Sequence, residues 1–287
     1  MNDKIYNIYY CSDNNGLELL KQSIRSIIKN CTSTYTVHCL LLGVDEIDGF
    51  CDELNVVDNV KVKAYDCSGV LDGKFEDYSD TASIKHITKT TMLRMFPDKF
   101  IDLSEMDKLL YLDTDTYINK DLKELFEIDL TGYYLGAVRD FYTIFSKHFA
   151  YKEHEFYKER VMKKNYFNGG VELLNVRKMV DENKFKEMQE FNLMPYMKFT
   201  DQDIYNFLFE GGVKLIDPKY NCKCWMNFIK NDVTIIHAAG CKNKLEVLKK
   251  VDNNIQVCHS RRKYFAYYKI ENYNADIEMN KNKNRGI

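Results

Sequence analysis

Short apolar runs alternate with longer amphipathic stretches along the first part of the chain. The runs at 5–11, 36–42 and 60–65 have the length and composition of β-strands. The stretches between them, at 17–30 and 45–54, place apolar residues at helical spacing. Alternating strands and helices are typical of βαβ units on a parallel sheet, so the pattern predicts an α/β fold.

The run DKLLYLD at 107–113 predicts a central strand. A helical pattern at 81–96 and Pro97 precede it, and its continuous apolar centre is typical of a strand that is buried on both faces. Asp113 and Asp115 lie where this strand ends. Ligands of open α/β sheets bind beyond the carboxyl ends of the strands, so the sequence predicts a binding site at these two carboxylates.

The rest of the chain continues with the same two patterns. Strand-like segments are predicted at 133–140, 169–176, 212–216 and 233–240, and helical segments at 150–164 and 201–209. The sequence has no internal repeat, no low-complexity linker and only three prolines, so it predicts no sharp domain boundary. We expect one catalytic domain over residues 1–244 and a basic, aromatic C-terminal extension over residues 245–287.

The composition is that of a globular protein. Hydrophobic residues make up 45% and charged residues 29% of 287 positions, and no apolar run is long enough to span a bilayer. The N-terminus lacks the pattern of a secretory signal, so the default expectation is a cytoplasmic location. Nine cysteines, an odd number, favour reduced thiols. The close pair Cys222 and Cys224 lacks the ligand spacing of a zinc site.

The charge is unevenly distributed. A net charge of −2 gives no global field for nucleic acid. From residue 242 to residue 287, however, 11 Lys and Arg residues stand against 5 acidic ones, among many tyrosines. Such segments are typical of peripheral contact with an anionic membrane surface, and a packed C-terminal helix with a solvated basic face is the alternative interpretation.

The D-x-D pattern of Asp113 and Asp115 has a direct chemical use. Two carboxylates that converge can bind Mg²⁺ or Mn²⁺ and leave coordination positions for phosphates. The cation would neutralise charge that develops on a nucleoside diphosphate leaving group. Two alternatives fit the pattern: an Asp-rich turn that caps the helical segment at 121–126, and the D-x-D-x-T motif of phosphatases with an aspartyl nucleophile. Three βα-like units before the motif, and no later G-D-x-x-x-D, argue against the phosphatase.

Seven short segments follow one another in a recognisable order. They are NIYYCSDNN at 7–15, TMLRMF at 91–96, KLLYLDTDT at 108–116, DLKELF at 121–126, FNGGVELLN at 167–175, DQDIYN at 201–206 and IHAAG at 236–240. Over residues 4–244 they resemble glycosyltransferase family 8, most closely its bacterial lipooligosaccharide galactosyltransferases and more distantly the glycogenins. The resemblance implies a GT-A fold, in which helices flank a Rossmann-like mixed, mainly parallel sheet. It also implies a UDP-sugar donor, Mn²⁺, and retention of anomeric configuration.

The resemblance implies residues for the metal and the nucleoside. Asp113, Asp115 and His237 would bind the metal, and Asp13 and Asn14 would hold uracil and ribose. From the residues alone, Asp13 and Asn14 predict only a loop turn. A lone histidine after an apolar strand is more often structural.

The resemblance also implies residues for the donor phosphates. Arg94 would lie near the phosphate and sugar, whereas without the resemblance it would be a surface arginine in an ion pair. Thr114 and Gly240 would contact the donor. The family usually continues as H-x-x-G-x-x-K-P-W, but here Asn243 stands at the lysine position. Either neighbouring lysine, Lys242 or Lys244, is therefore a candidate for the diphosphate.

The sugar and acceptor pocket is implied by two further segments and one aspartate. The residues are Asn168, Gly169 and Gly170, then Asp201 and Gln202, and finally Asp140. Two glycines permit positive φ and close approach. Asp201 and Asp203 also suit a helix N-terminus.

The sequence thus predicts a metal-dependent hexosyltransferase that moves glucose or galactose from a UDP-sugar to a glycan, glycolipid or protein acceptor. Because Gln202 is an amide and a poor nucleophile, we expect the departing phosphate oxygen to help deprotonate the acceptor. Two alternatives stay open. One is glycogenin-like self-glucosylation, suggested only by the 21 tyrosines. The other is a nucleotide-sugar-binding module without catalysis.

Overall fold

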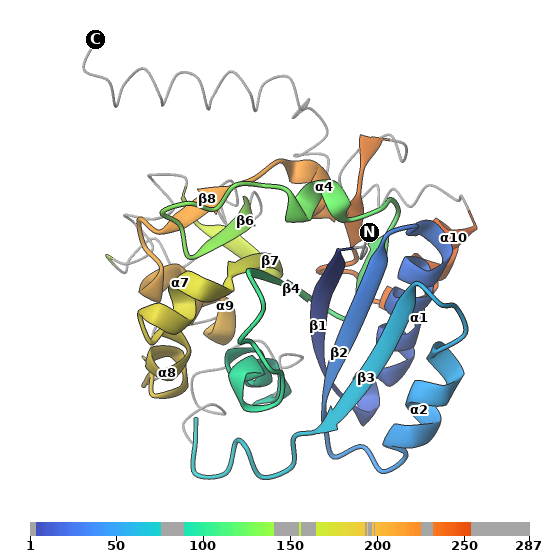
Figure 1. The fold of residues 1–287 in the computed structure, drawn as a ribbon, viewed down its shortest axis with the longest axis horizontal. Helices are drawn as coiled ribbons and strands as arrows, with labels where there is room; N and C mark the ends of the chain where they lie inside the picture. Colours follow the sequence, from blue (N-terminus) through green and yellow to red (C-terminus); the bar gives the residue numbers. More distant parts are fainter. Residues whose placement is uncertain are drawn as a thin grey trace.

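Two β-sheets organise the protein (Figure 1). The computed structural model describes residues 4–75, 89–140, 165–192, 199–224 and 232–253, together with Glu155, Met194 and Met197. The larger sheet has seven strands in the order β3-β2-β1-β4-β7-β6-β8, and the smaller has three in the order β5-β10-β9. Helices flank the larger, mainly parallel sheet, so the predicted fold class is confirmed.

One half of the large sheet is parallel. It comprises β1 (Ile5–Asp13), β2 (Thr34–Leu42), β3 (Val60–Asp66) and β4 (Lys108–Leu112). The helices α1 (Leu17–Asn30) and α2 (Ile47–Leu54) connect the first three strands. Their apolar residues recur at helical spacing and are buried against the sheet, which is why this half follows the sequence pattern closely.

The other half changes direction at β7 (Phe167–Asn175). This strand is antiparallel to both of its neighbours, β4 and β6 (Leu135–Arg139), whereas β8 (Val213–Leu215) is parallel to β6. The helices α7 (Val176–Asp181), α8 (Lys184–Gln189) and α9 (Thr200–Leu208) lie beside this half (Figure 1). Because β7 begins where β4 ends, the backbone N–H of Asp113 bonds to the carbonyl of Gly170 at 2.9 Å.

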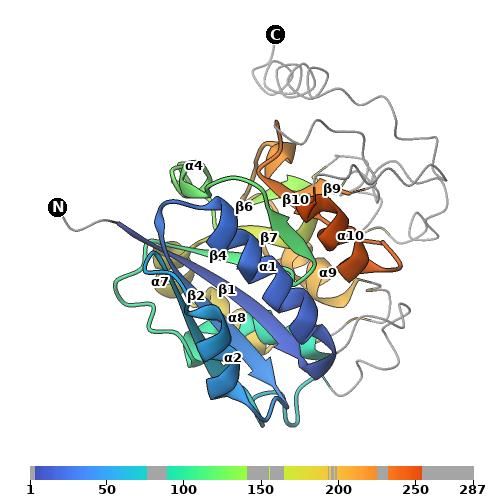
Figure 2. The same ribbon diagram turned by 90° about the vertical axis from the view of Figure 1, so that its right-hand side faces the viewer.

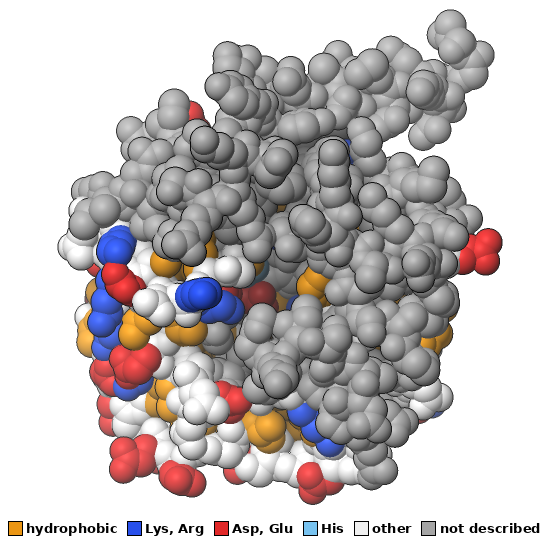
Figure 3. Space-filling view, turned by 180° about the vertical axis from the view of Figure 1, so that it is seen from behind, with side chains coloured by type: hydrophobic (Ala, Val, Ile, Leu, Met, Phe, Trp, Pro, Cys, Tyr) orange, Lys and Arg blue, Asp and Glu red, His pale blue; other side chains and the backbone are white. Residues whose placement is uncertain are grey.

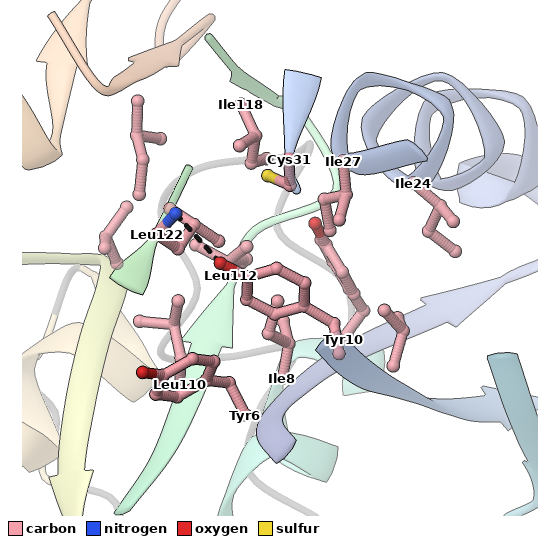
Figure 4. Close-up of a cluster of buried hydrophobic side chains, with 14 of the residues drawn as sticks. Tyr6, Ile8, Tyr10, Ile24, Ile27, Cys31, Leu110, Leu112, Ile118 and Leu122 are labelled. Carbon is pink, nitrogen blue, oxygen red and sulfur yellow. Dashed lines mark hydrogen bonds between the residues drawn. The ribbon is translucent and has the colours of Figure 1, made fainter. Parts of the chain in front are cut away.

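Hydrophobic clusters cover both faces of the large sheet. In the cluster shown in Figure 4, tyrosine and isoleucine side chains of β1 and leucines of β4 meet Ile24 and Ile27 of α1. The second cluster joins Tyr9 and Tyr111, on the opposite faces of the same two strands, to Tyr205 of α9. Both faces exclude water, so successive strand residues are apolar rather than alternating.

The small sheet connects the middle of the chain to its C-terminal part. β10 (Ile235–His237) is antiparallel to β5 (Thr116–Ile118) and parallel to β9 (Cys222–Lys223). α10 (Lys244–Asp252) packs on this sheet and beside α1 (Figure 2), and Lys29 of α1 pairs with Asp252 at 2.7 Å. The pairing of β10 with β5 places His237 opposite Thr116, directly after the D-x-D motif.

The structure refines two local predictions. The described part of the helical stretch predicted at 81–96 is a 3-10 helix over Lys89–Met95, where the β-branched Thr90 and Thr91 disfavour an α-helix. The apolar run at 233–240 contributes only a three-residue strand, because the chain turns at Ala238 to place the following loop. The predicted helical segments at 81–88 and 150–164 lie outside the described residues, apart from Glu155.

The sulfur atoms of Cys224 and Cys241 approach each other, but their Cα atoms are 7.9 Å apart, beyond the range of an ordinary disulfide, so the expectation of reduced thiols stays a prediction. The other described cysteines are Cys11, Cys31, Cys39, Cys51, Cys67 and Cys222, and they are free. The contact between Cys224 and Cys241 brings the end of β9 against the turn after β10. Counting cysteines could not reveal it, because strand pairing between distant segments decides which sulfurs meet.

The described surface has a mixed character. On the face shown in Figure 3, charged side chains of both signs are interspersed and apolar side chains occur in small groups. Among the described residues, no helix has the length and apolar character needed to cross a bilayer. The division of the chain at residue 244 stays a prediction: α10 forms its described part, and the basic, tyrosine-rich segment from 254 onward lies outside the described residues.

Candidate active site

A cavity of about 620 Å³ opens beyond the carboxyl ends of β1 and β4. Most residues that the sequence singled out line it, although they come from segments spread over the whole chain. They are Asp13, Arg94, Asp113, Thr114, Asp115, Asp140, Asn168, Gly169, Gly170, Asp201, Gln202, His237, Gly240 and Lys244. Asn14 and Lys242 do not belong to this lining.

Asp113, Asp115 and His237 form a compact cluster in the cavity wall. Their candidate ligand atoms all lie within 4.8 Å of one another. The Nε2 atom of His237 is 3.1 Å from Asp115 Oδ1 and 3.5 Å from Asp113 Oδ2. Two carboxylates and an imidazole are a donor set that suits Mn²⁺ or Mg²⁺, so these residues fit a divalent cation.

The alternative role of the D-x-D motif as a helix cap is wrong. The helix α4 (Lys123–Phe126) follows a different aspartate, Asp121, whose Oδ1 accepts a hydrogen bond from the Lys123 N–H at 2.9 Å. Asp121 also accepts from the backbone N–H groups of Thr32 and Ser33. Asp113 and Asp115 are therefore left to face the cavity.

Opposite charges set the electrostatics of the cluster. Burial favours the neutral carboxyl of Asp115, but His237 and Lys244 hold its pKa well below the usual range. Burial disfavours a charged imidazole, yet the two aspartates raise the pKa of His237 to about 9. The ammonium of Lys244 lies 2.7 Å from Asp115 Oδ2. Without a bound cation, both ring nitrogens of His237 carry a proton at neutral pH. A divalent cation bound there would replace the proton on Nε2.

Gly169 and Gly170 are required by close packing rather than by backbone conformation. A Cβ atom on Gly170 would lie 2.1 Å from His237 Cε1 and 2.8 Å from Asp113 Oδ2. On Gly169 it would lie 2.9 Å from Arg94 Nη1. Neither glycine has a positive φ. Gly240 is the opposite case, with φ at +74° and open space around it. The sequence could not distinguish these two uses of glycine.

Arg94 is buried, so its interpretation as a surface arginine is wrong. Only 1% of the residue is exposed. Its guanidinium is 2.7 Å from Asp201 Oδ2 and 2.5 Å from Glu172 Oε2, and it stacks 3.9 Å from the centroid of the Tyr111 ring. Burial raises the pKa of Glu172 to about 8, against the effect of Arg94. Arg94 thus bridges Glu172 and Asp201, and its contact with Asp201 orients that carboxylate in the cavity wall.

The three residues of the segment Asp201–Asp203 have different roles. Asp203 stabilises the start of α9, because its Oδ2 accepts a hydrogen bond from the Phe199 N–H at 2.8 Å. Asp201 and Gln202 face the cavity. Gln202 Oε1 accepts hydrogen bonds from Asn168 Nδ2 at 2.9 Å and from the Gly169 N–H at 3.0 Å. Both the helix-terminus interpretation and the cavity interpretation of this segment therefore hold, for different residues.

A buried ion pair lies at the same end of the cavity. Lys223 Nζ is 2.8 Å from Asp140 Oδ1, and both side chains are buried. Asp140 Oδ2 also accepts a hydrogen bond from Gln202 Nε2 at 3.3 Å. These groups line the cavity with alternating donors and acceptors, which is the requirement for binding hydroxyl groups.

The other end of the cavity is built by the turn after β1. Asp13 Oδ1 accepts from the Asn15 and Gly16 N–H groups, and its Oδ2 accepts from Thr90 Oγ1 at 3.1 Å. Asn14 is exposed and donates to the carbonyl of Gly43 at 2.6 Å. The structure therefore does not bring Asn14 to the cavity, and Asn15 and Gly16 take that place.

Among the polar residues that were missed in the sequence, three support the functional side chains of the site. Glu172 is a charged residue within the apolar segment GGVELLN, a signal that was visible. Asn221 and Lys223 flank Cys222, where attention went to the cysteine spacing. Their role becomes evident only from the pairing of β9 with β10, which no local pattern encodes.

Sequence comparisons with known proteins point to one family. A family model described as Glycosyl transferase family 8 matches residues 7–261. A Haemophilus influenzae protein assigned as a glycosyltransferase is 33% identical over 225 residues, covering 75% of this chain and 62% of that protein. A lipopolysaccharide 1,2-glucosyltransferase of Escherichia coli is 28% identical over 158 residues, covering 48% of this chain and 44% of that enzyme. The chain thus spans less than two thirds of these relatives.

Solved structures show the same fold. The galactosyltransferase LgtC, in complex with donor and acceptor sugar analogs, superposes with a TM-score of 0.62 at 22% identity, covering 88% of this chain and 98% of that chain. The bifunctional glycosyltransferase WbbM superposes with a TM-score of 0.64 at 20% identity, covering 84% of this chain and 46% of that chain.

Proposed function

The chain belongs to glycosyltransferase family 8, and from this premise we propose that it transfers glucose or galactose from a UDP-sugar to a hydroxyl group, with a divalent cation and with retention of anomeric configuration. One observation carries the proposal. Asp113 and Asp115, which follow β4, converge with the distant His237 into one cation-binding cluster on the cavity wall. Family membership also removes the ground for the phosphatase alternative.

The proposed cation site lies in reach of a lysine suited to the donor diphosphate. Asp113, Asp115 and His237 would hold Mn²⁺ or Mg²⁺, which supplies neutralisation of the charge on the leaving diphosphate. We assign the diphosphate lysine as Lys244, because it lines the cavity whereas Lys242 is exposed and outside the lining. Thr114 and Gly240 line the same wall and would bring backbone groups to the phosphates.

The remaining lining residues fit a nucleoside at one end and a sugar at the other. Asp13 and its turn would hold the nucleoside. The hydrogen-bonding groups around the sugar are those of Asp140, Asn168, Gly169, Asp201 and Gln202. Arg94 would act through Asp201, which it orients.

The hydrogen bonds of Gln202 support a front-face mechanism. Both lone pairs of its amide oxygen already accept hydrogen bonds, so attack by this oxygen on the sugar would break at least one of them. The departing phosphate oxygen would instead help deprotonate the acceptor hydroxyl on the same face of the sugar. Intact-protein mass spectrometry during turnover should detect no glycosyl adduct, and an adduct on Gln202, Asp201 or Asp140 would disprove this mechanism.

The acceptor is proposed as a glycan, glycolipid or protein. A glycolipid acceptor would agree with the Escherichia coli relative, which is a lipopolysaccharide 1,2-glucosyltransferase. We also propose that the basic extension contacts an anionic membrane, and liposome binding tests this proposal. The full chain should bind anionic liposomes more tightly than a chain ending near residue 245, and equal binding would exclude the idea.

The deciding experiment is UDP release from a panel of UDP-sugars with Mn²⁺. The wild-type protein should hydrolyse one donor slowly, and chelation of the metal or the substitution Asp115→Ala should abolish release. Asp129→Ala is a matched control, because that carboxylate accepts hydrogen bonds from Thr131 of its own turn and does not line the cavity. Tight binding of a UDP-sugar without turnover, even with acceptors, would indicate the non-catalytic binding module. A ladder of hexose adducts on the protein itself would indicate self-glucosylation.

A further inference from the structure

A continuous chain of side-chain hydrogen bonds runs beneath the cavity from His237 to Gln202. His237 Nδ1 is 2.8 Å from Asn221 Oδ1, and Asn221 Nδ2 is 2.8 Å from Asn168 Oδ1. Asn168 Nδ2 is in turn 2.9 Å from Gln202 Oε1. All four residues are less than a tenth exposed. We call these four residues the amide relay.

The polarity of the amide relay follows from two backbone groups. A peptide N–H can only donate, so the Gly170 N–H, 3.1 Å from Asn168, identifies the atom it meets as the Asn168 oxygen. The Gly169 N–H identifies the Gln202 oxygen in the same way. These two assignments fix the orientation of Asn168 and Gln202 without any hydrogen position being known.

The orientation of Asn221 and the tautomer of His237 then follow. The Asn221 atom that meets the Asn168 oxygen must be the donating Nδ2, so the Asn221 oxygen faces His237. His237 Nδ1 must therefore carry a proton. The unshared pair of a neutral His237 is left on Nε2, the nitrogen that faces Asp113 and Asp115.

We propose that Asn221 is a positioning residue that fixes His237 in its metal-binding tautomer and, through Asn168, couples the cation site to the orientation of Gln202 at the sugar end of the cavity. The inference rests on the proposed function for the identity of the two ends. It extends that function by making cation binding and sugar orientation parts of one hydrogen-bonded unit. Groups behind a metal-binding histidine typically change metal affinity by about 10- to 100-fold when removed.

Two substitutions of Asn221 test its contact with His237 and its contact with Asn168 separately. Asn221→Ala removes both the acceptor for His237 and the donor to Asn168. Asn221→Asp keeps an acceptor for the His237 N–H but presents a second oxygen to the Asn168 oxygen. Asn168 cannot relieve this repulsion by a flip of its side-chain amide, because its Nδ2 group would then face the Gly170 N–H, donor against donor.

The metal readout is titration of free Mn²⁺ by electron paramagnetic resonance, without any donor. Asn221→Ala should weaken Mn²⁺ binding by about tenfold or more, and Asn221→Asp should bind within about threefold of the wild type. The activity readout is UDP release from the preferred UDP-sugar at saturating Mn²⁺. There Asn221→Asp should lower kcat by about tenfold or more, because the repulsion displaces Asn168 and weakens its hydrogen bond to Gln202. A merely structural residue would not give this division between affinity and turnover.

Asn59→Ala is the matched control. Its amide also donates two hydrogen bonds, partly buried, to the carbonyls of Cys31 and Ser33, but it does not line the cavity. It should lower the melting temperature without changing Mn²⁺ affinity. Should Asn221→Ala fail to fold, the division shown by Asn221→Asp decides alone.

The outcomes separate the inference from the function on which it rests. Equal Mn²⁺ affinity of the wild type and Asn221→Ala overturns the amide relay and leaves the proposed function intact. Equal weakening by Ala and Asp also overturns it, because the acceptor for His237 would then be irrelevant. Absence of Mn²⁺ binding by the wild-type protein overturns the proposed cation site and the relay with it.

Discussion

Two buried histidines in different regions of the molecule are held in opposite charge states. His38 lies on β2 in the parallel half of the large sheet, and His237 lies on β10 in the small sheet; they are 3% and 2% exposed. Burial and the nearby Lys63 lower the pKa of His38 to about 4. Against the effect of burial, Asp115 and Asp113 raise the pKa of His237 to about 9.

The difference comes from the neighbours and not from the depth of burial. His38 is hydrogen-bonded by neutral groups only, the Tyr65 hydroxyl at 2.9 Å and Asn7 Oδ1 at 3.2 Å. His237 faces two carboxylates on one side and the neutral Asn221 on the other. A buried imidazole beside carboxylates is a place where a divalent cation can replace a proton, whereas a neutral imidazole among neutral partners only supports the fold.

The largest effect should come from exchanging each histidine for glutamine. His237→Gln should reduce metal-dependent UDP release by about a thousandfold or more, because the cation loses its imidazole ligand. His38→Gln should leave kcat unchanged. Similar losses in both variants, measured on folded protein, would remove the functional distinction between the two residues.

The next effect is on stability as a function of pH in metal-free protein, measured by urea unfolding with a chelator present. The lowered pKa of His38 means that the unfolded chain binds more protons between its ordinary pKa of 6.5 and about 4, so stability is lost as the pH falls through that window. The raised pKa of His237 means that its contribution is present below 6.5 and lost as the pH rises towards about 9. Each histidine contributes about 3 kcal/mol at most to the free energy of unfolding.

Variants and metal should each change one side of this pH profile. His38→Gln should flatten the acidic side alone, and His237→Gln the alkaline side alone. Mn²⁺ should also flatten the alkaline side, because the cation takes the place of the proton on His237. A profile in which both variants alter the same side would contradict the assigned pKa directions.

A smaller effect should separate two glycines. Gly170→Ala forces a shift of His237 or Asp113 and should weaken Mn²⁺ binding by about tenfold or more. Gly49 lies within α2, and a Cβ added there would meet nothing within 4 Å. Gly49→Ala should therefore raise the free energy of unfolding by about 0.5–1 kcal/mol. Mn²⁺ titration and urea unfolding of both variants test this, and unchanged Mn²⁺ affinity in Gly170→Ala would contradict the close packing.

The smallest effect concerns the support of His38. Tyr65→Phe removes the hydroxyl that hydrogen-bonds to Nδ1 and should cost about 1 kcal/mol of stability. Mn²⁺ affinity should not change. A change in Mn²⁺ affinity would show that the two regions are coupled.

The fold could be predicted wherever a short-range pattern is sufficient. The apolar stripe of α1 and the doubly buried β4 are local features, and both appear where the sequence indicates. The direction of β7 and the pairing of β9 with β10 depend on contacts between distant segments, so they stay invisible in periodicity.

The same limit applies to the site. Asp113 and Asp115 were evident because a hydrophobic strand ends at them. Asn221 was not, because its importance depends on His237, which lies 16 residues further along the chain. Asn14 was assigned by its position in a resembling motif, but its amide is turned outward to Gly43. A motif identifies a turn more reliably than it identifies which side chain of the turn faces inward.

The pairing of β10 with β5 also has a consequence for how the protein is made. Asp115 leaves the ribosome well before His237, by about 6–24 s at a synthesis rate of roughly 5–20 residues per second. A nascent chain that already carries β4 and both aspartates thus lacks the imidazole ligand and the wall formed by β9 and β10. On the proposed function, cation-dependent binding of a nucleotide sugar requires the small sheet, so an incomplete polypeptide should not consume the donor.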